Sequence, residues 1–261
     1  MSIPASLVKD LRDRTGAGMM DCKQALEDAN GDLDDAQKLL REKGIAAAGK
    51  RAGRKTTEGR VAASTTGSHA TLVAVGSETE PVSSNDEFLG FARRVLTAVE
   101  EGGPEAAAGL EDERVEMVAR LGENITIVGA ERYELADGGS VATYVHPPAN
   151  KIGVLVAVDG GDQGLARHLA MHIAFANPQY TTRDDVPAEE IDAERDTLAS
   201  LPEVVSKPED IRPKIVEGML SKRFFGESVL VDQPWIHDDS MTVGKALGKA
   251  RVRRFARLAL G

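Results

Sequence analysis

The sequence has 261 residues, of which 41% are hydrophobic, 28% charged and 4% aromatic, and its formal net charge is −10. This composition is ordinary for a soluble globular protein with a largely aliphatic core, and the negative charge argues against a protein that binds nucleic acid by neutralising phosphates. The single cysteine, Cys22, excludes a disulfide framework and fits a reducing compartment. No stretch approaches the ~20 apolar residues of a membrane-spanning helix and the N-terminus lacks a signal-peptide pattern, so we expect a cytoplasmic protein without membrane contact.

Residues 4–44 predict a module of three short helices. A Gly-Ala-Gly run at 16–18 ends the first helix, and an Asn-Gly pair at 30–31 ends the second. Asp32 can cap the third helix, whose apolar residues recur at helical spacing until Gly44 closes it. A compact helical domain of this size is near the lower limit for independent folding, so we expect it to use a partner surface.

The next segment, residues 45–60, is strongly basic. Its charged residues are Lys50, Arg51, Arg54, Lys55, Glu58 and Arg60. Alanines and glycines are interleaved with them, so the segment predicts a helix tail that runs into a flexible basic linker. Such a charge run is typical of a solvated face, and the alternative is that it approaches an acidic partner or RNA.

Strands alternate with helices over the next hundred or so residues. The first two strands predict a hairpin that turns at Gly67-Ser68. After a loop over residues 76–83, Ser84 and Glu87 have the spacing of a capping box at the start of a helix. In chain order the predicted elements are strands 61–65 and 70–75, helices 84–102 and 110–121, strands 125–128, 141–145 and 154–158, and a helix 163–176.

An internal repeat is visible within this region. The run TLVAV at 71–75, followed by a Phe-rich helix, resembles the run VLVAV at 154–158, followed by a helix rich in Ala, Leu and His. We therefore expect two hairpin-plus-helix units related by pseudo-symmetry. The pattern predicts an α+β fold in which helices cover one face of each small antiparallel sheet.

The last part of the sequence predicts a helical hairpin and a short closing segment. Residues 187–225 have two apolar stripes at helical spacing, separated by a turn at Leu201-Pro202, and so predict an antiparallel helical hairpin that protrudes or makes contacts. A short strand at 229–231 and a short helix near 243–247 follow. The basic residues between 249 and 257 predict a basic tail.

The sequence contains no recognisable catalytic constellation. Neither GxGxxG after a strand nor GxxxxGK[ST] occurs, so no nucleotide-binding motif is present. Cys22 lies in a predicted helix without an activating partner and is interpreted as structural. His168 and His172 are four residues apart on a helix, a spacing that suits two metal ligands, but no third ligand is evident and surface or contact residues are the better interpretation. We therefore expect no enzyme, no cofactor and no metal.

Several features favour a binding protein instead. Met19 and Met20 are adjacent at the start of a helix, and two adjacent methionines cannot both face one small core. Residues 78–82 form an acidic loop, stiffened by proline, between a strand and a helix, which is a common place for functional residues. His172 shares a helix face with Phe175, as a contact patch would require. The hairpin over 187–225 is a further candidate surface.

Several runs of residues closely resemble the elongation factor Ts family. The most specific is LRDRTGAGMMDCKQAL at 11–26. The others are Gly31-Asp32, LREKG at 40–44, GENI at 122–125, GVLV at 153–156, AMHIA at 170–174, Asn177-Pro178 and QPW at 233–235. Because these runs extend over nearly the whole chain, the resemblance covers the complete organisation and not a single motif.

The resemblance implies a guanine-nucleotide exchange factor for the translational GTPase elongation factor Tu, which it binds through the GTPase domain and a further domain. Exchange of this kind disturbs the magnesium and phosphate sites of the partner, releases GDP, and needs neither covalent chemistry nor direct nucleotide binding. The resemblance also implies an α+β architecture with a ubiquitin-associated-like N-terminal domain. Its parts are a three-helix domain 1–45, a basic linker 46–60, a core N-subdomain 61–140 and a core C-subdomain 141–261 that includes a helical hairpin insert at about 187–225.

Family contact residues map onto specific positions of this sequence. Partner-binding positions by resemblance are Lys9, Arg12, Met19, Met20 and His172. The loop that dislocates magnesium in the family is usually Thr-Asp-Phe-Val, and here it is Thr79, Glu80, Pro81 and Val82. The acid is retained with one more methylene, but the aromatic side chain is absent.

Two other functions stay open at the level of sequence. The altered loop is compatible with a divergent paralogue that binds or assembles with a translational GTPase without exchanging its nucleotide. A metal-dependent enzyme built on His168 and His172 is the third. Nucleotide-release kinetics separate the first two, and metal analysis tests the third.

Overall fold

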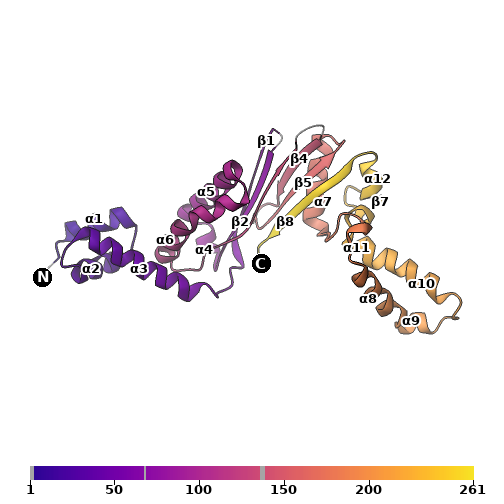
Figure 1. Cartoon of the computed structure of the whole chain (residues 1–261), viewed down its shortest axis with the longest axis horizontal. Helices are drawn as coiled ribbons and strands as arrows, with labels where there is room; N and C mark the ends of the chain where they lie inside the picture. The colour runs from indigo at the N-terminus through magenta and orange to yellow at the C-terminus, as the bar shows by residue number, and fades with distance from the viewer. Residues whose placement is uncertain (1–2, 68, 136–138) are drawn as a thin grey trace.

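The N-terminal helices form a small domain at one end of an elongated molecule (Figure 1). The computed structural model describes residues 3–67, 69–135 and 139–261. Gly16, in the left-handed conformation, ends the first helix, and the Asp32 carboxylate caps the third by accepting hydrogen bonds from two backbone N–H groups at 2.9 Å. The helices are α1 (Ala5–Thr15), α2 (Met19–Asp28) and α3 (Leu33–Arg51). Their inward faces form a core of their own around Leu11, Cys22 and Leu26.

The helix α3 is longer than predicted. It continues through Gly44, where the sequence predicts its end, to Arg51. The reason is a packing contact, because a Cβ atom on Gly44 would lie 3.1 Å from the Cβ of Ala119 on the neighbouring helix α6 (Glu111–Leu121). Gly44 therefore serves close helix packing and not termination. The helix tail predicted after residue 45 is confirmed as far as Arg51, and residues 52–57 connect it to the first strand.

The first sheet is antiparallel in the order β1-β2-β3 and is covered on one face by helices. Its strands are β1 (Glu58–Thr66), β2 (His69–Ser77) and β3 (Thr126–Glu134). The covering elements are α4 (Glu80–Ser83), α5 (Asp86–Gly102), the 3₁₀ helix η1 (Pro104–Leu110) and α6. The predicted hairpin is confirmed in its strands, while Ser68 of the predicted turn lies outside the described residues.

The start of α5 differs from the prediction. Asn85, and not Ser84, is the N-cap, and its side-chain oxygen accepts a hydrogen bond from the Glu87 N–H at 2.8 Å. Ser84 lies at the end of the short helix α4, which occupies part of the predicted loop. The Ser84 hydroxyl instead accepts a hydrogen bond from Arg60 at 2.9 Å.

The second sheet repeats the first in the order β4-β5-β8, with α7 (Gln163–Ala176) on its outer face. Its strands are β4 (Gly139–Val145), β5 (Ile152–Asp159) and β8 (Arg251–Ala259). The prediction of a basic tail is wrong, because these residues form the edge strand β8. Its arginines have partners, since Arg253 forms an ion pair with Asp159 at 2.7 Å and Arg254 lies over the Tyr133 ring at 3.7 Å.

The predicted repeat is confirmed by the pairing of the central strands. The register of β2 with β3 shifts between Ala74 and Val75, and that of β5 with β8 shifts between Ala157 and Val158. These are equivalent positions of the two similar runs, so the units share even their irregularity. The two sheets pack through one hydrophobic cluster, in which a side chain on Gly153 would meet Leu72 at 2.8 Å.

The helical hairpin protrudes at the other end of the molecule (Figure 1). It has a separate hydrophobic cluster that includes Leu198, Val216 and Leu220. Its helices are α8 (Ala188–Ala199), α9 (Pro202–Val205) and α10 (Arg212–Met219), followed by a π-helical turn (Leu220–Phe225) and α11 (Gly226–Ser228).

The strand predicted at 229–231 is wrong. Only Val229 makes a bridge, to Tyr180, and residues Leu230–Asp232 form a 3₁₀ turn. The chain then forms a hairpin of β6 (Pro234–Trp235) and β7 (Asp238–Thr242), followed by the predicted helix α12 (Val243–Leu247). The α+β class is confirmed. Within the part of the chain that the structure describes, none of the helices combines the length and the apolar character that a membrane span requires.

Candidate partner-binding surface

The N-terminal candidate residues lie on the outside of their domain. Lys9 and Arg12 are exposed one turn apart on α1. Met19 and Met20 are 56% and 73% exposed at the first turn of α2. The buried face of α2 consists of Cys22, Ala25 and Leu26, which leaves both methionines outside the core. The prediction that this pair is exposed is confirmed.

The segment Thr79–Val82 is an exposed, firmly held corner of the first sheet unit. Thr79, Glu80 and Pro81 are exposed, and Val82 is half-buried against the core under α5. The Glu123 carboxylate accepts hydrogen bonds from the Thr79 N–H at 3.0 Å, the Thr79 hydroxyl at 2.5 Å and the Glu78 N–H at 3.1 Å. The loop is therefore anchored at its base, while the Glu80 side chain is exposed.

A second set of contacts fixes the same corner from the other side. Glu78 accepts a hydrogen bond from the Asn124 N–H at 2.7 Å and pairs with Arg54 at 3.3 Å. Arg60 donates to the Ser84 hydroxyl at 2.9 Å and to the Ala149 carbonyl at 3.0 Å. Two residues of the basic segment thus have structural partners.

Through Arg60, the exposed loop over residues 146–150 of the second unit lies beside the corner. The Asn150 carbonyl of this loop also accepts a hydrogen bond from the Val61 N–H at 2.7 Å. The sequence offered no signal for Arg60 as a bridge between the two units.

His172 is buried in a closed hydrogen-bond network. Its Nδ1 accepts from the Ile236 N–H at 3.4 Å, so its Nε2 carries the proton and donates to Gln233 Oε1 at 2.9 Å. The Gln233 amide donates to the carbonyls of Glu227 at 2.6 Å and Ala176 at 3.3 Å. The imidazole also stacks on Trp235 with ring centroids 5.2 Å apart.

The network favours a neutral imidazole. Burial lowers the pKa of His172 below its ordinary value, and the nearby His237 acts in the same direction, while the Gln233 hydrogen bond opposes them. Both ring nitrogens are engaged, so neither has a free lone pair for a metal. Among the described residues no group of three or more His, Cys, Asp and Glu side chains is placed to hold a metal ion.

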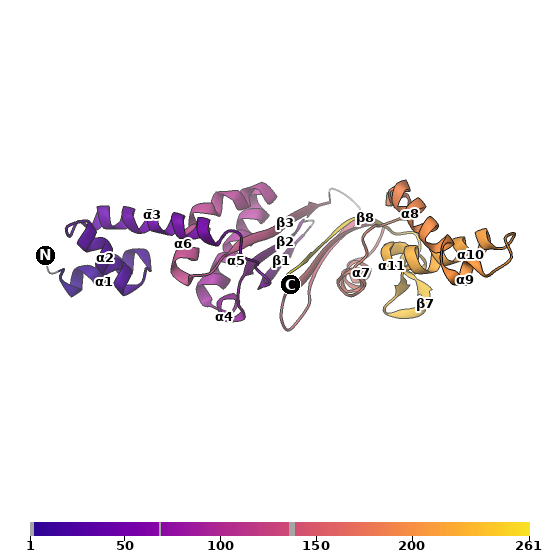
Figure 2. The same ribbon diagram turned by 90° about the horizontal axis from the view of Figure 1, so that it is seen from below.

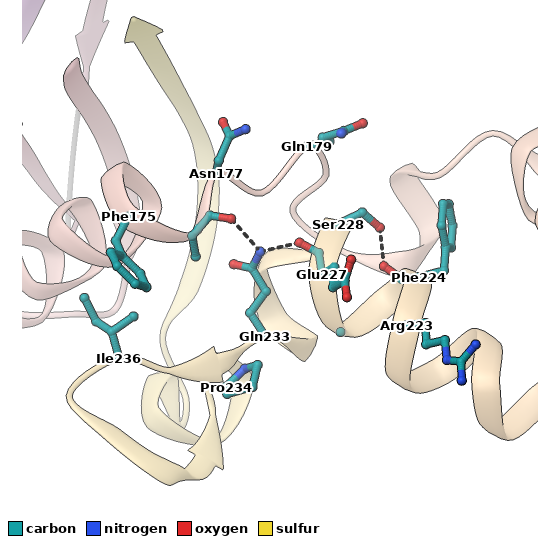
Figure 3. Close-up of a pocket in the computed structure, with 12 residues that line it drawn as sticks. Phe175, Asn177, Gln179, Arg223, Phe224, Glu227, Ser228, Gln233, Pro234 and Ile236 are labelled. Atoms are coloured by element: carbon teal, nitrogen blue, oxygen red, sulfur yellow. Dashed lines mark hydrogen bonds between the residues drawn. The ribbon is translucent and has the colours of Figure 1, made fainter. Parts of the chain in front are cut away.

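The prediction of His172 as a surface residue is wrong, since its exposed fraction is 0%. Phe175 lies on the exposed face of α7 instead, with 80% of its surface exposed. Figure 3 shows the Phe175 ring beside Ile236, which is 39% exposed. The exposed apolar patch at this place therefore consists of Phe175 and Ile236, and His172 is buried and accepts a hydrogen bond from the Ile236 N–H.

An open pocket of about 650 Å³ adjoins this patch. It lies between the end of α7, the π-helical turn with α11, and β6 (Figure 3). Gln233 forms its inner wall and is held by the two carbonyl hydrogen bonds drawn in the figure. Both apolar side chains, such as Phe175 and Phe224, and polar ones, such as Asn177 and Arg223, line the pocket.

The three candidate segments do not meet in one site. They belong to the N-terminal domain, the first sheet unit and the second sheet unit, spread along the length of the molecule (Figure 1). In Figure 2, however, α1 and α2, α4, and α7 with β7 lie along the lower side, whereas α3 and α8 lie along the upper side. Such an arrangement is typical of a protein that binds a large partner through several separate segments of one side.

Comparison with known proteins agrees with this class. The family model described as "Elongation factor TS" matches residues 78–261. Elongation factor Ts of Alkalilimnicola ehrlichii is 43% identical over 275 aligned positions, which cover 100% of this chain and 93% of that protein. Elongation factor Ts of Halorhodospira halophila is 45% identical, with the same coverage. That of Idiomarina loihiensis is 42% identical and covered to 92%.

The chain belongs to the elongation factor Ts family and is thus a translation elongation factor. The match of the family model begins within the corner that carries Thr79–Val82, while the relatives align with the N-terminal domain as well.

Proposed function

We propose that the chain is a guanine-nucleotide exchange factor that binds elongation factor Tu and promotes the release of GDP. The observation that carries this proposal is the exposed Glu80, held out from a corner whose base is anchored by Glu123. Family membership supports the choice of partner. The mechanism requires no covalent step, because release of a bound nucleotide needs only a change in the relative stability of two states of the partner.

The Glu80 carboxylate is suited to disturb a magnesium site. Carboxylate oxygen is a preferred ligand of Mg²⁺, and a negative charge brought close to the bound phosphates opposes theirs. The Glu123 hydrogen bonds hold the backbone at Thr79, so little conformational entropy is lost when the corner enters the partner. Glu80 thereby destabilises the GDP-bound state more than the nucleotide-free state, which is the difference that accelerates exchange.

The other two segments supply affinity. Lys9 and Arg12 on α1 present positive charge, and Met19 and Met20 on α2 of the same domain present soft, adaptable side chains, a combination suited to a surface of the GTPase domain. The patch of Phe175 and Ile236 presents rigid apolar area, which we assign to a further domain of the same partner. His172 acts beneath that patch, because its hydrogen bond to the Ile236 N–H fixes the turn between β6 and β7 that carries Ile236.

The decisive experiment measures release of fluorescent GDP from purified elongation factor Tu over a range of concentrations of this chain. The parent protein is expected to accelerate release. Glu80→Gln is expected to lower the maximal rate about ten-fold, which corresponds to ~1.4 kcal/mol of lost differential binding, without weakening the complex. Glu105→Gln, an exposed acid away from the corner, is the control and should behave as the parent.

The same measurement separates exchange from binding alone. Complex formation without acceleration by the parent chain would show a non-exchanging binding partner and overturn the proposal. An equal loss for Glu80→Gln and Glu105→Gln would show that only overall charge matters.

A further inference from the structure

The C-terminal end of α6 touches two of the candidate segments at once. Arg120 lies in the last turn of this helix, and Glu123 follows it three residues later. Arg120 reaches the N-terminal domain, and Glu123 holds the corner at Thr79. The two segments are far apart in the sequence and belong to different domains. Residues 120–123 contact both of them and so link the position of one to that of the other.

The contact of Arg120 with the N-terminal domain is close and specific. A Cβ atom built on Gly16 would lie 2.5 Å from the Arg120 Cδ, so the arginine stem lies directly against this glycine. Gly16 is in the left-handed region at φ +67°, and it is followed by Ala17, Gly18 and then the exposed methionine pair. The Arg120 stem therefore supports the turn that presents Met19 and Met20.

The guanidinium of Arg120 forms an ion pair with α5, without a hydrogen bond at its Nε. Its Nε lies 3.2 Å from Glu87 Oε2, and the arginine side chain is only 23% exposed. The docking of the domain also uses Arg41, which pairs with Asp112 at 2.8 Å on the far part of α6. Arg41 connects α3 to α6. Arg120 instead contacts the turn at Gly16, between α1 and α2, and so determines the direction in which that turn faces.

We propose that Arg120 is a positioning residue that holds the N-terminal contact segment in register with the corner anchored by Glu123. The inference rests on the proposed function for its effect on exchange, but the positioning itself is a property of the free chain. If the two contact segments are already held in register, binding of the second segment costs little orientational entropy. If the N-terminal domain is loose, it must be ordered when the partner binds, and this ordering lowers the affinity.

The first test measures the relative position of the domains without any partner. Spin labels attached at Asp10→Cys and Glu101→Cys, both exposed positions, report the distance between α1 and α5 by pulsed electron resonance. Arg120→Ala is expected to broaden the distance distribution. Arg94→Ala is the matched control, because it removes another ion pair between α5 and α6, that of Arg94 with Glu113, without touching Gly16.

The second test measures GDP release from elongation factor Tu. Arg120→Ala is expected to raise the half-saturating concentration about five-fold while the maximal rate stays within about two-fold of the parent, because ordering the domain costs affinity and not the action of Glu80. Arg120→Lys keeps a stem and a charge and should restore most of the affinity. Arg94→Ala should match the parent.

An unchanged distance distribution for Arg120→Ala overturns the proposal, and so does an equal effect of Arg94→Ala in both tests. If the parent chain releases no GDP, the proposed function fails, while the distance measurement still decides whether Arg120 positions the domain.

Discussion

Pro81 stands where the resemblance to the family implies the aromatic residue of the loop motif. It is the second residue of α4, in the first turn of that helix, and its side chain is exposed. If a phenyl ring at this position enters a pocket of the partner, its burial contributes ~1.5–3 kcal/mol. We predict that Pro81→Phe accelerates GDP release from elongation factor Tu by about ten-fold or more, as measured with fluorescent GDP.

The same variant should leave the free energy of unfolding almost unchanged, because the side chain at 81 is exposed. A rate that is unchanged or slower would show that the aromatic ring has no place in the partner of this chain, whose exchange then depends on Glu80 and the other segments.

His172 makes the stability of the second unit depend on pH. The unfolded chain binds a proton at this residue near its ordinary pKa of 6.5, and the folded chain does so only at lower pH because burial lowers the pKa. Between the two values the unfolded state holds more protons, so the free energy of unfolding falls as the pH is lowered below about 6.5. Urea unfolding at about pH 7.5 and about pH 5.5, followed by the fluorescence of Trp235, measures the loss.

The matched variant for this effect is His172→Phe, which fills much of the same space without a titrating group. It leaves the Gln233 oxygen and the Ile236 N–H without partners, so we expect a cost of ~2–4 kcal/mol at neutral pH. The pH dependence below 6.5 should shrink in the variant; if it persists unchanged, other groups and not His172 cause it.

At the scale of elements, the N-cap of α5 lies one residue later than predicted, at Asn85 and not at Ser84. Asn85→Ala removes the side-chain acceptor of the Glu87 N–H, and we predict a loss of ~1 kcal/mol in the free energy of unfolding. Ser84→Ala should cost less, since it removes only an exposed contact with Arg60. Urea titrations of both variants decide between the two caps, and a larger loss for Ser84→Ala would contradict the structure.

Elements with a strong period were predictable, and elements defined by contacts across the chain were not. The helix from Gln163 to Ala176 and the paired strands β1, β2, β4 and β5 follow from local hydrophobic spacing and stop residues. Gly44 was misread because a glycine that allows close helix packing looks the same in sequence as one that ends a helix. The arginines of β8 read as a tail because their partners, such as Asp159, are distant in sequence.

The candidate site divides in the same way. The exposure of Met19 and Met20 followed from their adjacency, which no small core can accommodate on both sides. The burial of His172 could not be predicted, because its partners Gln233 and Ile236 lie on a hairpin more than sixty residues away. Glu123 was visible only as part of a family motif, and its hold on Thr79 required the fold.

At the scale of the whole molecule, the hydrophobic cores are separate. The N-terminal domain, the helical face of each sheet, the space between the sheets and the helical hairpin each have a cluster of their own. A small core of this kind can open without the rest of the molecule. The unfolding of this chain is therefore not expected to follow one two-state transition.

A core substitution in the N-terminal domain tests this independence. Leu26→Ala removes a fully buried side chain from a cluster of few residues, and the expected cost of ~2–5 kcal/mol is comparable with the stability of so small a domain. We predict rapid hydrogen exchange in α1 and α2 and unchanged protection in β2 and β5, as measured by mass spectrometry of peptides. Equal loss of protection in both regions would show that the domains unfold together.

The burial of the lone thiol gives the molecule a chemical indicator of its own. Cys22 is fully enclosed in the N-terminal core, and burial raises its pKa, so the folded domain holds it as an unreactive thiol. An alkylating reagent can modify Cys22 only while the N-terminal domain is open. The rate of alkylation therefore reports how often that domain opens. If a bound partner covers the methionine pair above it, alkylation of Cys22 should slow, and the state of the docking domain can be followed in the native chain without any label.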